Sequence, residues 1–169
     1  MRTRQLHDGD VETVVDVLCT EGWPFHAGPP PTPEDVRARV AGGWLSGPDH
    51  ETHALLEDDD RVVGVVRLLD LDDDTAEFDL RLRAGDRGRG LGTAAVRWLT
   101  AHVFTTRACH RVEAMTREDN AAMRAVLLRC GWVQEARHRE AWPTCDGRRL
   151  DAVGYAVLRP DWESGAVTP

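Results

Sequence analysis

Lysine is missing from this 169-residue sequence, and all 21 basic residues are arginines. A Walker-type phosphate-binding loop needs a lysine, so the absence excludes that class of nucleotide site. The arginines are scattered along the chain, and the formal net charge is -8. A nucleic-acid-binding protein would carry a basic patch or tail, so we expect no nucleic acid as a partner. An acidic surface favours a cationic small molecule or a basic peptide, although the same charge can serve solubility alone.

Cysteine is sparse and dispersed. Cys19, Cys109, Cys130 and Cys145 form no C-x-x-C pair and no cluster with histidine. They therefore predict neither a zinc site nor a disulfide framework, and they suit the reduced thiols of a cytoplasmic protein. No apolar run has the length of a signal peptide or reaches the roughly 20 residues of a membrane span, so we expect no membrane contact.

The length and the 41% of hydrophobic residues suit one core, which predicts a single domain over residues 1–162 and a loose tail over 163–169. The hydrophobic pattern alternates in some segments and has helical spacing in others, which predicts a mixed α/β fold. Strands are expected at 1–6, 50–57, 61–72, 76–83, 111–116, 131–142 and 148–158, and helices at 11–22, from 33 onward, at 94–104 and at 120–130. The result is a mostly antiparallel sheet of six or seven strands flanked by about four helices.

The segment "RGRGLGT", residues 87–93, places three glycines at alternate positions just before a predicted helix. A helix N-terminus presents unpaired N–H groups, and glycines let an anion approach the backbone closely. With Arg87 and Arg89 adding positive charge, a pyrophosphate is the natural ligand. A turn that only caps the helix would account for one or two of the glycines, but not for three glycines with two arginines.

A dinucleotide-binding fingerprint is an alternative interpretation of this loop. Gly88 and Gly90 fit it, and Glu113 at the end of the next strand could bind a ribose. Its third glycine, however, would have to be Thr93, and the loop follows an antiparallel meander rather than a first parallel strand.

The pattern Arg-x-x-Gly-x-Gly, formed by Arg87, Gly90 and Gly92, resembles the acyl-coenzyme A motif of the GNAT acetyltransferases. A second segment, "NAAMRAVLLRCGW", is similar to the RimJ/RimL-like branch of that superfamily at Asn120, Val126, Leu127, Gly131 and Trp132. With the closing "YAVLRPDW", the resemblance covers about residues 1 to 162.

This resemblance implies a GNAT-like fold, with a sheet splayed at the cofactor site, and acetyl-coenzyme A as co-substrate without a metal. It assigns cofactor contacts to backbone groups near Leu82 and Arg83, to the loop, and to Asn120, which can also cap its helix. The loop contacts are Arg87, Gly88, Arg89, Gly90, Leu91, Gly92 and Thr93.

The strand "AEFDLRLR" carries the candidate catalytic carboxylates. Alternation places Glu77 and Asp79 on one face, with the strand running towards the glycine loop. Acetyl transfer to an amine needs a base to remove a proton from the ammonium. The resemblance assigns that role to Glu77, with Asp79 in reserve. The alternative is a solvated face on which Asp79 pairs with Arg81.

Two further expectations concern the acceptor side. Trp23, Phe25 and His26, in the proline-rich loop, are expected to line an acceptor pocket that Trp142 faces, unless Trp23 and Phe25 only plug the sheet. Many relatives place a tyrosine or serine where this chain has Leu127 and Met123, so no acid for the leaving thiolate can be assigned. Tyr155, the only tyrosine, is expected to have a core or sheet role.

The sequence therefore predicts an N-acetyltransferase in which a primary amine attacks acetyl-coenzyme A directly in a ternary complex. The acceptor classes left open are a small amine such as an amino acid or polyamine, an aminoglycoside-like antibiotic, and a protein N-terminus. The alternative is a non-catalytic acyl-coenzyme A binding module. Both a monomer and a homodimer are compatible with the sequence.

Overall fold

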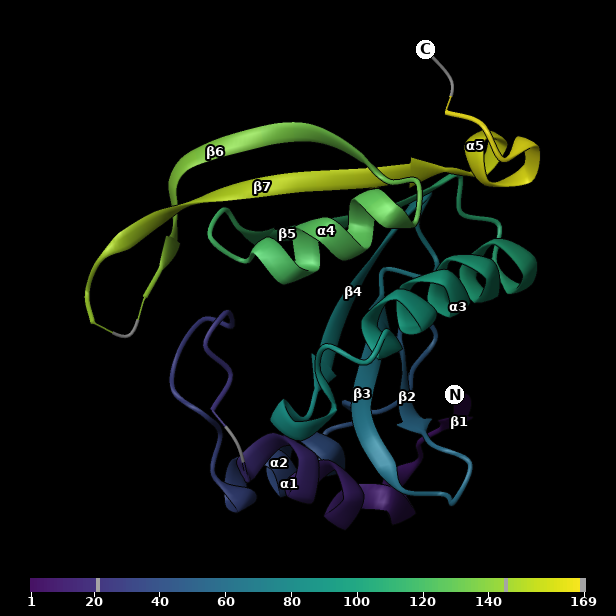
Figure 1. Cartoon of the computed structure of the whole chain (residues 1–169). Coiled ribbons are helices and arrows are strands. Elements are labelled where there is room, and N and C mark those ends of the chain that lie inside the picture. The colour runs from purple at the N-terminus through teal and green to yellow at the C-terminus, as the bar shows by residue number, and fades with distance from the viewer. Residues whose placement is uncertain (21, 145, 168–169) are drawn as a thin grey trace.

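The computed structural model describes residues 1–20, 22–144 and 146–167, and seven strands within this part form one sheet. The strands are β1 (Arg2–Gln5), β2 (Glu51–Leu56), β3 (Val62–Leu69), β4 (Thr75–Leu82), β5 (Arg111–Arg117), β6 (Val133–Pro143) and β7 (Arg149–Leu158). The helices are α1 (Val11–Cys19), α2 (Pro33–Ala41), α3 (Leu91–Thr106), α4 (Ala121–Arg129) and α5 (Arg159–Ser164), with short 3-10 turns η1 (Asp8–Asp10) and η2 (Ala84–Asp86) (Figure 1).

The strand order is β1-β2-β3-β4-β5-β7-β6. Every neighbouring pair is antiparallel except β4 and β5, which run parallel. The predicted mixed fold with a mostly antiparallel sheet is thus confirmed. The doubly wound parallel sheet that a dinucleotide-binding fold requires is excluded.

The parallel pair is short. It joins Thr75 to Arg111, Ala76 to Val112 and Glu77 to Glu113, and β4 and β5 part beyond that point. The sheet is therefore splayed in its middle, on the side towards which both strands run. A gap between two parallel strands leaves backbone groups available to a ligand.

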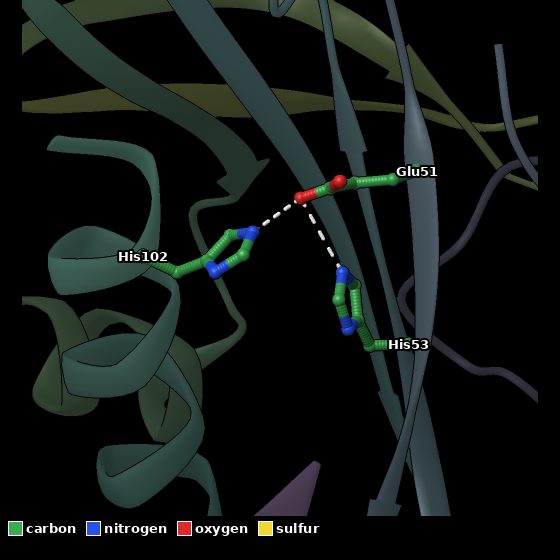
Figure 2. A group of neighbouring side chains, drawn as sticks. All are labelled: Glu51, His53 and His102. Atoms are coloured by element: carbon green, nitrogen blue, oxygen red, sulfur yellow. Dashed lines mark hydrogen bonds and ion pairs between the residues drawn. The ribbon is translucent and has the colours of Figure 1, made fainter. Parts of the chain in front are cut away.

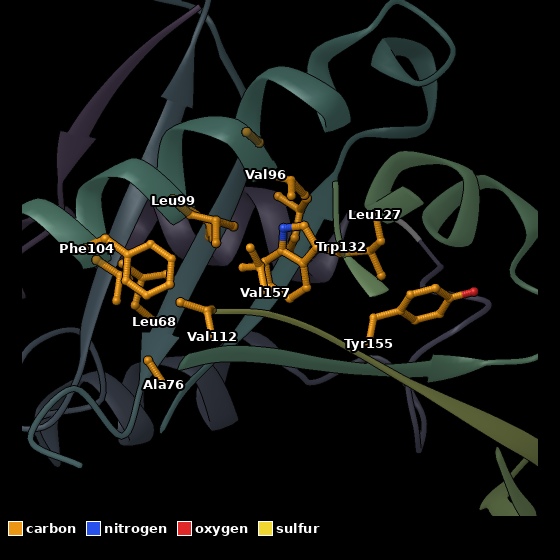
Figure 3. Packing of buried hydrophobic residues seen from close by; sticks show 14 of the residues in the cluster. Leu68, Ala76, Val96, Leu99, Phe104, Val112, Leu127, Trp132, Tyr155 and Val157 are labelled. Carbon is orange, nitrogen blue, oxygen red and sulfur yellow. The ribbon is translucent and has the colours of Figure 1, made fainter. Parts of the chain in front are cut away.

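Helices cover both faces of the sheet. On one face, α3 and α4 pack over β3, β4, β5 and β7 around a core that includes Leu99, Leu127 and Trp132 (Figure 3). On the other face, α1 and α2 pack over β2 and β3, with Val14 and Val36 at the centre. Alternation along β4 sends Ala76 and Leu80 into the first core. Its charged residues consequently face the side of α1 and α2.

Local sequence signals explain several element boundaries. Thr32 caps α2 by accepting from Asp35 N–H at 3.2 Å, while the Asp35 carboxylate accepts from Thr32 N–H at 3.0 Å, a capping box with Pro33 at the first helical position. The acidic segments 58–60 and 72–74 are exposed turns, as expected.

The fifth helix, α5, begins directly after β7 and includes the first two residues of the segment 163–169. Pro160 lies in its first turn, and the Trp162 ring packs 5.6 Å from that of Phe104 on α3. None of the helices in the described part of the chain combines the length and apolar character needed to cross a bilayer.

Candidate active site

The glycine loop connects η2 to α3 and has the backbone conformation that its glycines allow. Gly88 has φ of +74° and Gly90, the N-cap of α3, has φ of +83°, in the left-handed region that other residues rarely adopt. The first intrahelical bond runs from Ala94 N–H to Gly90 O at 3.0 Å. The N–H groups of Leu91, Gly92 and Thr93 therefore have no intrahelical acceptor and form an anion site at the helix N-terminus.

A cavity of about 420 Å³ opens beside this loop, between the end of β4, the start of α3, α4 and the loop after α1. Ten of the predicted site residues line it: Trp23, Phe25, His26, Leu82, Arg87, Gly88, Gly90, Gly92, Thr93 and Asn120. The remaining lining residues were not predicted from the sequence, and they are Pro24, Leu80, Arg81, Ala122, Met123, Ala125, Val126 and Arg129. The lining is mostly apolar and includes three arginines, Arg81, Arg87 and Arg129, which suits a phosphate-bearing ligand with an apolar part.

Three arginines near the glycine loop differ in their hydrogen-bond partners. Arg89 donates to Asp86 at 2.8 Å and to Glu57 at 2.6 Å and does not line the cavity. The hydrogen bond from Arg61, together with Arg89, lowers the pKa of buried Asp86. Arg87 donates to Leu82 O at 3.0 Å and lines the cavity, as does Arg129, which donates to Thr93 Oγ1 at 3.3 Å.

The loop after α1 crosses the gap between the splayed strands. Its His26 Nε2 lies 2.8 Å from Asp79 Oδ1 on β4, and Arg117 at the end of β5 donates to Pro24 O at 2.6 Å. The Arg117 guanidinium also lies over the Phe25 ring, 5.2 Å from its centroid. Pro24, Phe25 and His26 thus connect β4 to β5 beyond the point where the two strands stop pairing.

Trp23 anchors the same loop. It is buried, and its indole N–H donates to Leu18 O at 3.0 Å. The guanidinium groups of Arg81 and Arg87 lie 5.5 and 5.6 Å from the ring centroid. Trp23 therefore packs into the core beside the sheet and also lines the cavity next to the glycine loop, whose lining does not include Trp142.

A second, acidic recess of about 140 Å³ lies on the other side of the splay point. Glu77 on β4 and Glu113 on β5 face the same side there, since they form the last pair before the strands part. Glu77 is exposed, but desolvation by its surroundings and the neighbouring charge of Glu113 raise its pKa above the usual value. Arg111, hydrogen-bonded to both Glu113 and Glu135, balances part of the negative charge.

Asp79, two residues along β4, has the opposite electrostatic setting. Burial acts to raise the pKa of Asp79, but hydrogen bonds and charges from His26 and Arg81 outweigh it and lower the pKa to about 2. Arg81 donates to Asp79 at 3.0 and 3.1 Å. Asp79 is therefore a permanent carboxylate that fixes His26 in the wall of the large cavity.

The model of the family described as "Acetyltransferase (GNAT) domain" matches residues 1–133, which include the glycine loop, β4 and α4. The chain belongs to the GNAT acetyltransferase family. This family uses acetyl-coenzyme A, and the chain is accordingly an N-acetyltransferase.

Relatives of this GNAT domain agree with that assignment. The chain is 28% identical over 173 residues to a Bacillus subtilis (strain 168) protein named "Putative ribosomal N-acetyltransferase YdaF", with 95% of this chain and 92% of that protein covered. A Vibrio cholerae spermidine N-acetyltransferase solved with CoA and spermine matches with a TM-score of 0.84 at 16% identity, covering 96% and 97% of the two chains. A dodecameric form of a V. cholerae spermidine N-acetyltransferase matches with a TM-score of 0.82 at 15% identity, covering 98% of each chain. These structures have the same fold.

Several predicted residues of this GNAT domain lie away from the large cavity. Glu77 lines the acidic recess. Asp79 does not line the large cavity itself, but it is hydrogen-bonded to His26, which does. The side chain of Arg83 pairs with Asp16, and its backbone N–H donates to Val63 O at 2.9 Å. Leu91 is not among the residues that line the cavity. Trp142 lies opposite Leu150 near the end of β6 and is not among the lining residues of this cavity.

The start of α4 in this GNAT domain confirms one interpretation of Asn120. Its side-chain oxygen accepts from Met123 N–H at 3.3 Å, and its amide donates to Thr116 Oγ1 at 3.0 Å, so it caps the helix while lining the cavity. Tyr155 is buried in the core, and its hydroxyl donates to Gln134 and accepts from Arg124. The expected core role of Tyr155 is thus confirmed.

Proposed function

We propose that this chain is a RimJ/RimL-like N-acetyltransferase that transfers the acetyl group of acetyl-coenzyme A to a primary amine by direct attack in a ternary complex. One observation supports this above all. The cavity beside the glycine loop is lined by the end of β4, and the recess with a raised-pKa carboxylate lies further back on the same strand, at its last pair with β5. Glu77 is only three residues along β4 from Leu80 in the cavity wall, about 10 Å of strand.

Each part of the site has a role in this proposal. The pyrophosphate binds the N–H groups from Gly88 to Gly92, and the pantetheine arm follows the end of β4 towards the splay point. The acceptor ammonium approaches from the acidic recess, where Glu77 and Glu113 attract it. Glu77 removes one ammonium proton, directly or through a water, which leaves a neutral amine.

The chemical step then needs no covalent enzyme intermediate. The amine nitrogen forms a bond to the thioester carbonyl carbon and gives up its second proton to water, the C–S bond breaks, and coenzyme A leaves as a thiolate that takes a proton from water. The residues at the positions where relatives carry a hydroxyl do not supply that proton, because Leu127 is buried in the core and Met123 is apolar. The small amines, aminoglycoside-like antibiotics and protein N-termini all present the primary amine that this step requires.

The second candidate is a non-catalytic acyl-coenzyme A binding module, which the lack of a hydroxyl at 123 and 127 favours. One experiment separates the two. Acetyl-coenzyme A should raise the melting temperature in both cases, but only an enzyme releases free thiol in the presence of an amine panel and not in its absence. Thermal stabilisation without amine-dependent thiol release across all three acceptor classes would establish the binding module instead.

A further inference from the structure

A group of three metal-ligating side chains lies far from the cofactor loop, between β2 and α3. Glu51 and His53 project from β2 on the same face, and His102 projects from α3 towards them (Figure 2). One ligand atom from each residue lies within 4.8 Å of the others. His102 lies ten residues beyond Gly92, so the group is about 15 Å along the helix from the anion site.

His53 is the least well bonded member of this group. It is only 5% exposed, and its Nε2 contacts Glu51 Oε1 at 3.3 Å without completing a hydrogen bond of good geometry. A buried polar atom with incomplete hydrogen bonding costs free energy, so a bond to a metal ion would satisfy this imidazole nitrogen. The same Glu51 oxygen also receives a hydrogen bond from His102 Nε2.

We propose that Glu51, His53 and His102 form a binding site for a divalent transition-metal ion of the zinc type. Two imidazole nitrogens and one carboxylate oxygen are a ligand set that such ions prefer, and three protein ligands leave one position for water. Ligand atoms of a tetrahedral zinc lie about 3.3 Å apart, given Zn–N and Zn–O bonds of about 2.0–2.1 Å. The separation of Glu51 Oε1 and His53 Nε2 is 3.3 Å.

The surroundings hold the ligands in place. Arg107 donates to the second oxygen of Glu51 at 3.2 Å, which leaves Oε1 directed at the two histidines. Trp98 stacks on the His102 ring at 4.9 Å and meets the His53 ring edge-on at 4.8 Å. Because the His102 side chain is partly exposed, it offers an entry path and can move back to admit the ion.

The proposed ion would act on structure rather than on acetyl transfer. It would link β2 to α3, the helix whose first turn forms the anion site, and it is remote from the reacting groups. No local pattern in the sequence indicates this group, because His102 follows His53 by 49 residues and none of the ligands is a cysteine. The inference does not depend on the proposed acetyl transfer.

The test is zinc titration of chelator-treated protein against a chromophoric competitor, followed by thermal melts. We expect about one zinc per chain, and a rise in melting temperature of about 5 to 10 °C at a free zinc concentration a hundred times the Kd. His102→Gln should weaken zinc binding at least about 100-fold and remove this rise. The matched control His110→Gln changes an exposed histidine outside the group and should bind zinc as the wild type does.

His53→Gln provides a second, buried ligand variant, with circular dichroism to confirm that each variant is folded. Cobalt(II) should give the intense visible absorption of a four-coordinate site in the wild type and in His110→Gln, but not in His102→Gln. Zinc uptake well below one ion per chain, or equal affinity in a folded His102→Gln variant, would overturn the proposal. So would a loss of affinity in His110→Gln as large as that in His102→Gln.

Discussion

The cofactor cavity and the acidic recess lie on either side of the same splay point but are built differently. The cavity depends on backbone conformation, with left-handed Gly88 and Gly90 leading into the unpaired N–H groups of α3. The recess depends on side chains from three strands, with Glu77, Glu113 and Glu135 supplied by β4, β5 and β6. A contiguous segment determines the first site, and tertiary packing assembles the second.

The two carboxylates of β4 show what this difference means for chemistry. Glu77 and Asp79 share a face, yet their pKa values shift in opposite directions. Glu77 lies next to another carboxylate, whereas Asp79 lies between His26 and Arg81. Neighbours contributed by other segments therefore decide which of the two can act as a base near neutral pH.

The largest effect is expected from Glu77→Gln, which keeps the shape of the side chain and removes its basicity. Turnover should fall by roughly 10²–10⁴-fold while the affinity for acetyl-coenzyme A is kept. A base works only when deprotonated, so the wild-type rate should decline as the pH falls through the raised pKa of Glu77. The variant should lack this acidic limb in a pH–rate profile.

Asp79→Asn is the matched control on the same face of β4. Because the pKa of Asp79 is already lowered to about 2, the variant should leave the position of the acidic limb nearly unchanged. Wild-type rates for Glu77→Gln across the whole pH range would show that the base is another group, with Asp79 or His26 next in line.

The next largest effect is expected at Gly90. Valine there would have to adopt φ near +83°, which strains a β-branched residue and shifts the N–H groups of the loop. Gly90→Val should weaken acetyl-coenzyme A binding by at least about tenfold, since each 1.4 kcal/mol is tenfold in affinity. The measurement is the rise in melting temperature on adding acetyl-coenzyme A, which the variant should lose.

Gly85→Val is the control for that loop, because Gly85 has an ordinary φ and open space where a Cβ would stand. It should retain the thermal shift. A full shift in Gly90→Val would mean that the cofactor does not use this helix N-terminus.

A smaller effect should separate the arginines of the cavity. Arg129 lines the cavity and has only Thr93 Oγ1 as a hydrogen-bond partner among the described residues, whereas Arg89 is bound by Asp86 and Glu57. Arg129→Gln should raise the Kd for acetyl-coenzyme A by about 3- to 10-fold, and Arg89→Gln by less than that. Isothermal titration of both variants gives the ranking, and a greater loss in Arg89→Gln would reverse our assignment of the phosphate contact.

The smallest effect is a displacement of the pH profile. Glu113→Gln removes the like charge beside Glu77, so the pKa of Glu77 should fall and the acidic limb should move to lower pH. Turnover at pH values well above that limb should change little, because Glu77 is deprotonated there in both proteins. Glu135→Gln, which changes another carboxylate of the recess, is the control, and an equal displacement there would contradict a specific Glu77–Glu113 coupling.

Much of the architecture could be predicted because its signals are local. Alternation located β4 and placed Glu77 and Asp79 together, and the capping residues Thr32 and Asn120 marked the starts of α2 and α4. The glycine spacing located the left-handed turn that leads into α3. These features depend on dihedral angles and hydrogen bonds within a few residues, which a sequence pattern encodes directly.

The sequence by itself determined the order of the main helices and strands, the glycine-rich loop before α3 and the family to which the chain belongs. Only the tertiary structure decided which charges meet. Glu113 lies 36 residues after Glu77, His26 lies 53 residues before Asp79, and Arg129 reaches Thr93 from another helix. Electrostatic interactions depend on distance in space and on burial. Local spacing in the sequence predicts neither quantity for residues that lie far apart in the chain.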